Sequence, residues 1–117
     1  MPARLKVLSP DLVATAHAQG DTRALVKHYL AVLETRAPGR SVEVRVPPFA
    51  AVQVVPGVRH TRGTPPAVVE MDAETWLAVA TGRTTWADAL ASGRVAASGE
   101  RTDLTPYLPL SDGPATD

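Results

Sequence analysis

The spacing of the apolar residues changes twice along this chain, and that change limits the possible folds more than any other feature. Leu25, Tyr29 and Leu33 recur at every fourth position, which is the spacing of an amphipathic helix. Between residues 42 and 46, Val alternates with Glu and Arg, which is typical of a half-buried strand. Helical spacing returns after Asp72. An order of helices, strands and helices predicts an α+β fold.

Residues that begin and end helices divide the first third of the chain. Ser9 is a good N-cap, and Pro10 suits the first helical position because an N–H there would have no partner in the helix. Gly20 ends this helix and Asp21 caps the next one, which a Pro-Gly pair at residues 38–39 stops. We therefore expect the N-terminal helices within residues 10–36.

Short β-rich runs separated by turns make up the middle of the chain. A Pro-Pro pair at residues 47–48 and a Pro-Gly pair at residues 56–57 mark the turns. The expected strands occupy residues 42–46, 49–55, 58–60, 67–71 and 95–98. The sequence thus predicts about five strands in a mainly antiparallel sheet, with the helices packed on one face.

Two further helices are expected between residues 72 and 93. Asp72 caps the first, and Glu74 lies in its first turn, where the helix dipole favours a negative charge. Thr85 begins the second. The apolar side chains that we expect these helices to bury are Trp76, Leu77, Ala80, Trp86, Ala89 and Leu90. Two prolines within residues 104–110 leave room for only a turn of helix there.

The charges balance, which excludes several classes of protein. Twelve basic and twelve acidic residues argue against a broad nucleic-acid surface and against a polybasic membrane patch. The chain has no Cys, which excludes disulfides, thiolate nucleophiles and cysteine-ligated zinc. With no apolar run of membrane length and no signal-peptide pattern, we expect a cytoplasmic protein without stable membrane insertion. We expect one domain over residues 1–110 and a disordered tail over residues 111–117.

The titratable residues form no catalytic or metal-binding pattern. His17 and His28 are eleven positions apart and have no second ligand three or four positions away. We expect both to be exposed helix side chains. Asp72 and Glu74 are explained as helix-start residues. The sequence therefore predicts a non-catalytic protein without a metal or a cofactor.

The loop from residue 60 to residue 66 is the best polar candidate for a site. His60, Arg62 and Thr64 surround a glycine there. Arg62 could hold a carboxylate or phosphate through two parallel hydrogen bonds. Alternatively, the loop is a rigid turn in which Arg62 pairs with Glu70.

Two long segments of the sequence carry a family resemblance. The block VVEMDAETWLAVATGRTTWADALASGRVAASGE resembles the closing segment of the sterol carrier protein type 2 family, with its helix, Gly, helix and short strand. The segment RVPPFAAVQVVPGVRHTRGTPPAVVE is similar to a bacterial, largely actinobacterial, branch of that family. The resemblance covers the sheet and C-terminal helices, residues 41–110.

The resemblance implies a cavity for a lipid or acyl chain between helices and sheet. The wall residues that it implies are Phe49, Val52, Val54, Trp76, Leu77, Trp86 and Leu90. The loop with His60, Arg62 and Thr64 would lie at the mouth, and the segment with Tyr107 would cover it. The chain departs from the eukaryotic members in having one Phe and no Ile, which argues against a sterol-sized tunnel.

Other interpretations of the same residues stay open. The same apolar residues are also what the ordinary core of a small domain requires, and this interpretation is favoured for the tryptophans and for the strand valines. Related domains follow DinB-like helical domains in mycothiol-dependent proteins, so this chain could be an interaction or dimerisation module without a ligand. The sheet edge or the outer face of helix 22–36 would then be the surface, and a homodimer is possible. A role in thiol chemistry rests on that neighbourhood alone, because the chain lacks the histidine cluster of a DinB-like metal site.

Overall fold

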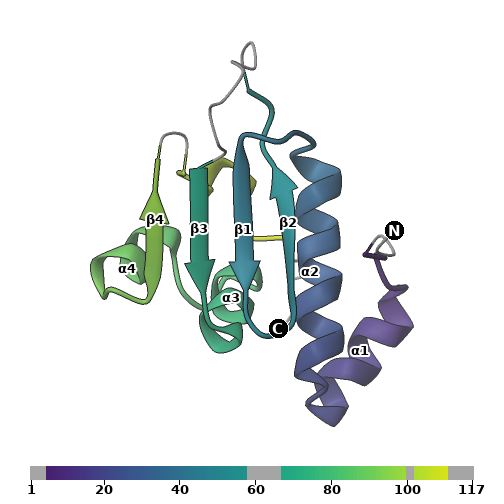
Figure 1. The fold of residues 1–117 in the computed structure, drawn as a ribbon. Helices are drawn as coiled ribbons and strands as arrows, with labels where there is room; N and C mark the ends of the chain where they lie inside the picture. The colour runs from purple at the N-terminus through teal and green to yellow at the C-terminus, as the bar shows by residue number, and fades with distance from the viewer. Residues whose placement is uncertain (1–4, 58–66, 100–101, 111–117) are drawn as a thin grey trace.

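The computed structural model describes residues 5–57, 67–99 and 102–110, and it has the expected order of helices, strands and helices (Figure 1). Two helices come first, three strands follow, and two short helices precede the last strand. The elements are α1 (Pro10–Gln19), α2 (Thr22–Arg36), β1 (Val42–Val46), β2 (Ala50–Val54), β3 (Ala67–Met71), α3 (Ala73–Ala80), α4 (Trp86–Ala91), β4 (Val95–Ser98) and the 3₁₀ turn η1 (Thr105–Tyr107).

The sheet is mixed, with the strand order β2-β1-β3-β4. β1 pairs with β2 and β3 pairs with β4 in antiparallel fashion, but the central pair of β1 and β3 is parallel. The described sheet thus has four strands instead of about five, and the expected antiparallel pairing holds for the two outer pairs but not for the central one. β3 lies beside β1 and not beside β2, its neighbour in sequence. The expected strand at residues 58–60 lies outside the described residues.

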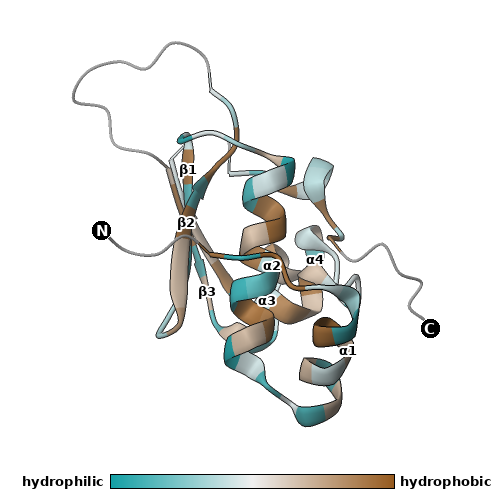
Figure 2. Ribbon diagram, turned by 90° about the vertical axis from the view of Figure 1, so that its right-hand side faces the viewer, coloured by the Kyte–Doolittle hydropathy of each residue, from teal (hydrophilic) through white to brown (hydrophobic). Residues whose placement is uncertain are grey.

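The helices cover one face of the sheet, as expected (Figure 2). Val42, Val44 and Val46 of β1 are fully buried against them. Arg45 between them is exposed on the opposite face. No described helix packs on that opposite face, so the sheet has one covered face and one open face.

Capping side chains hold each helix where the sequence predicts. In every case an oxygen of the cap accepts a backbone N–H from the first turn, which satisfies a donor that has no partner in the helix. The pairs are Ser9 with Leu12 at 3.3 Å, Asp21 with Ala24 at 3.1 Å, Asp72 with Thr75 at 2.7 Å, and Thr85 with Asp88 at 3.0 Å. Hydrogen bonds from Thr75 hold the pKa of the Asp72 carboxyl below its ordinary value.

His28 is buried, which contradicts the expectation that it is an exposed helix residue. Its Nδ1 accepts the Leu8 N–H at 2.9 Å, and its ring meets the Tyr29 ring edge-on with 4.7 Å between centroids. His17 is exposed as expected, and its Nε2 lies 3.0 Å from the Tyr29 hydroxyl. The N-terminal segment and α1 thus cover part of helix 22–36 around His28 and Tyr29, which removes these residues from the surface expected for docking.

Protonation of His28 is expected to destabilise this N-terminal cover. Burial lowers the pKa of His28 below its ordinary value, and the charge of His17 lowers it further. The unfolded chain therefore binds the proton more readily, so stability falls as the pH drops from about 6.5 through the lowered pKa. Urea unfolding at about pH 7.5 and about pH 5 measures the loss.

The matched variant for this experiment is His28→Asn, which keeps a hydrogen-bond acceptor for Leu8 but does not titrate. Its unfolding free energy should fall less between the two pH values than that of the wild type. An equal fall in both proteins would show that other groups cause the pH dependence.

Candidate functional site

Four of the residues expected to line a cavity lie deep in the core. Val52 and Val54 of β2 and Trp76 and Trp86 of the C-terminal helices are all buried in one continuous cluster. Val54 and Trp76 have no exposed surface. These positions fit a cavity wall and an ordinary core equally well.

The other described candidates lie at the margin of that core. Phe49, Leu77 and Tyr107 are partly buried and pack against it. Leu90 is 41% exposed, which contradicts the expectation that its helix buries it. The six-residue helix α4 packs inward through Trp86 and Ala89, and Leu90 lies at its uncovered end.

The polar residues expected at the mouth lie outside the described residues. These are His60, Arg62 and Thr64.

The two tryptophans differ in how their indole N–H groups are satisfied. Trp76 Nε1 donates to the carbonyl oxygen of Val26 at 3.4 Å, which ties α3 to α2. Trp86 is only 4% exposed, yet its Nε1 has no acceptor within the described part of the chain. A buried donor without a partner costs about 1–3 kcal/mol, so native proteins rarely retain one without a reason. Trp86 is therefore the one described core residue with an unused polar group.

The covered face of the sheet reaches the surface at β4. Ala97 pairs with Val69, so both side chains point to the helix side. Val69 is fully buried and Val95, two residues before Ala97, is also buried, but Ala97 is exposed. Figure 1 shows β4 at the sheet edge, with α4 beside its lower half. The covered face of the sheet is thus buried at Val95 and exposed at Ala97.

The C-terminal segment forms a cover over the core. Leu104 and Leu110 anchor it as buried residues, while Tyr107 and Leu108 between them are only half-buried. Polar contacts add to the burial of Leu110 at its end. Arg36 donates to the carbonyl oxygens of residues 109 and 110 at 3.0 Å each, and the Leu110 N–H donates to Ala80 at 2.8 Å.

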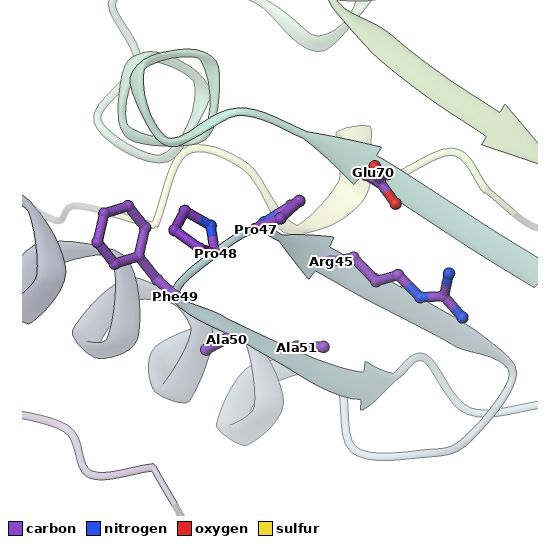
Figure 3. Close-up of a pocket in the computed structure, with 7 residues that line it drawn as sticks. All are labelled: Arg45, Pro47, Pro48, Phe49, Ala50, Ala51 and Glu70. Atoms are coloured by element: carbon purple, nitrogen blue, oxygen red, sulfur yellow. The ribbon is translucent and has the colours of Figure 1, made fainter.

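A shallow hollow of about 470 Å³ lies on the open face of the sheet (Figure 3). The turn residues Pro47, Pro48 and Phe49 lie at one end of it, and Arg45 and Glu70 lie at the other. Ala50 and Ala51 complete its lining. The Arg45 side chain is bonded to Glu43 at 3.0 Å. Sequence reasoning placed Phe49 in an interior wall, whereas part of its surface lines this outer hollow.

The described residues contain no group of three His, Asp or Glu side chains that could hold a metal ion. Among the same residues, no helix has the length and apolar character that crossing a membrane requires.

One protein-family model matches most of the chain. Its description is bacterial SCP ortholog, where SCP denotes sterol carrier protein, and it matches residues 18–110. The match includes α2, the whole sheet and the C-terminal cover. No curated protein matches the chain.

Removing the Arg36 guanidinium is expected to loosen the C-terminal cover. In Arg36→Met the two carbonyl contacts are lost, while the apolar stem of the side chain is kept. Amide hydrogen exchange at Leu110 should become about tenfold faster, which corresponds to about 1.4 kcal/mol.

Arg83→Met is the control for this prediction, because Arg83 bonds to Thr81 instead. It removes the same charge and should leave the exchange at Leu110 unchanged. Equal exchange rates in both variants would mean that the two buried leucines hold the segment without Arg36.

Proposed function

Because the chain belongs to the bacterial sterol carrier protein family, we propose that it binds and carries a small apolar ligand, such as a fatty acyl chain, without chemical change. The site is the apolar layer between the covered face of the sheet and the C-terminal helices. The observation that carries this placement is the exposed Ala97 on the covered face. We expect an acyl chain to enter the layer there, since it need not cross the sheet.

The lining of the layer supports binding through burial of apolar surface. Val69, the partner of Ala97 on β3, and Val95 on β4 are buried apolar neighbours of Ala97, and Trp86 is buried on α4, which packs against β4. Each methylene removed from water contributes about 0.8 kcal/mol. An acyl chain of moderate length therefore gains enough free energy to offset the cost of ordering it.

The C-terminal cover supports a route for ligand uptake. Its half-buried residues, Tyr107 and Leu108, lie between two buried anchors. Movement of these two residues enlarges the layer while Leu104 and Leu110 stay in place. Segments with few buried contacts have the lowest free energy of local opening. We therefore expect the C-terminal cover to open before the other parts of the wall.

The polar residues in the described core support binding over catalysis. They are His28 and Thr75. His28 accepts from Leu8, and Thr75 bonds to Asp72 at the start of α3. Both residues thus have structural partners.

The open face of the sheet favours a second function, as an interaction or dimerisation module. It carries the hollow with two exposed prolines and Phe49, which is a surface suited to another protein. This function needs no ligand in the core and leaves Ala97 free of any role. The two functions therefore use opposite faces of the same sheet.

Blocking the opening at Ala97 tests the carrier function. Ala97→Trp puts a bulky side chain on the covered side of β4, and Ala96→Trp puts the same side chain on the open side. Both positions are exposed, so both variants should fold. Native mass spectrometry of each protein, purified without detergent before and after organic extraction, measures bound lipid.

We expect an extractable mass in the acyl-chain range on the wild type and on Ala96→Trp, and a loss of at least about 90% of it on Ala97→Trp. Equal lipid on both variants would mean that the ligand does not pass Ala97. No bound mass on the wild type, with added fatty esters also failing to bind, would exclude the carrier function. A dimer peak that Ala96→Trp abolishes would favour the interaction module.

A further inference from the structure

We propose that the ligand presents one uncharged hydrogen-bond acceptor, such as an ester carbonyl oxygen, to Nε1 of Trp86. This inference rests on the proposed carrier function and specifies the chemical class of its ligand. The ligand is then an ester or another neutral acyl derivative, and the free carboxylate of a fatty acid is disfavoured.

The unused indole donor is the observation that points to an acceptor on the ligand. Trp86 and Trp76 are both buried in the same cluster, and Trp76 Nε1 donates to a backbone carbonyl. Trp86 Nε1 has no such partner among the described residues. A ligand oxygen at that point removes the penalty of a buried unpaired donor, so it gains affinity that a hydrocarbon lacks.

Trp86 lies on the helix that packs beside the same strand as Ala97. Trp86 begins α4, the helix that packs against β4, and Ala97 lies on β4. Leu90, one turn after Trp86, already reaches the surface. A ligand that enters at Ala97 and extends along β4 toward Val95 therefore approaches the helix that carries the donor.

The charges around this part of the layer favour a neutral acceptor. The described core contains no buried Lys or Arg that could pair with a carboxylate. Arg94, at the start of β4, is exposed and lies close enough to Asp72 to help stabilise that carboxylate. Arg36 is bonded to the C-terminal cover. A single N–H donor cannot offset the cost of burying an ionised carboxylate, whereas it satisfies an ester carbonyl.

A nuclear magnetic resonance titration tests this inference on the wild-type protein. The chain has two tryptophans, so its spectrum contains two indole N–H signals. Methyl octanoate and octanoate serve as matched probes that differ in the charge of the head group. We expect methyl octanoate to shift the Trp86 indole signal downfield and to bind at least about tenfold more tightly than octanoate at neutral pH.

Trp86→Phe removes the donor and keeps an aromatic ring, and it also assigns the indole signal. It should weaken binding of the methyl ester about fivefold to tenfold. Trp76→Phe is the matched control, since its donor is already used within the protein, and it should leave the affinity for the ester unchanged within about twofold.

The outcomes separate this inference from the carrier function. If neither probe nor any longer ester binds the wild type, both are wrong. If both probes bind equally, or the Trp86 indole signal stays in place while the ester binds, the inference about the acceptor is wrong and the carrier function stands. The indole signal of the wild type gives this answer even if Trp86→Phe does not fold.

Discussion

The alternation of side chains on β1 is the constraint on which the rest of the structure depends. Val42, Val44 and Val46 point to one side of the sheet and are fully buried, while Glu43 and Arg45 point to the other side. Because β1 is paired on both edges, its alternation fixes the register of its neighbours as well. All helices must then pack on the valine side. The open face, its hollow and the opposite placement of Ala96 and Ala97 all follow from this one pattern.

Much of the fold could be predicted because its signals are local. The caps and the limits of β3 and β4 depend on neighbouring residues only, and the structure confirms them. The parallel pairing of β1 and β3 could not be predicted, because alternation gives a strand but not its neighbour. The burial of His28 depends on a chain segment twenty residues away that folds over it. The pairing of β1 with β3 and the burial of His28 are both results of long-range packing, which no spacing rule describes.

The candidate site could be predicted only where burial follows from periodicity. Val52, Val54, Trp76 and Trp86 lie on apolar stripes, and all four are in the core. Leu90 continues such a stripe but lies where no described element covers it. The exposure of Ala97 could not be predicted from the sequence, because it depends on whether the neighbouring helices extend far enough to cover this end of β4. The hollow beside Phe49 needs residues from three strands, so only the folded sheet brings them together.

A well-packed layer is compatible with a carrier if the ligand itself opens it. A small domain has a net stability of only about 5–15 kcal/mol, so a permanently empty cavity is costly for a chain of 117 residues. In the proposed carrier, Tyr107 and Leu108 pack against the core when no ligand is bound. The free energy needed to move them is subtracted from the binding free energy, which makes binding weaker and release easier. Ligand bound only to the folded state still stabilises it, by about 2.7 kcal/mol at 100 times the Kd. A core that packs without ligand and opens to admit one thus combines a stable empty state with exchangeable binding, which are the two properties that a carrier requires.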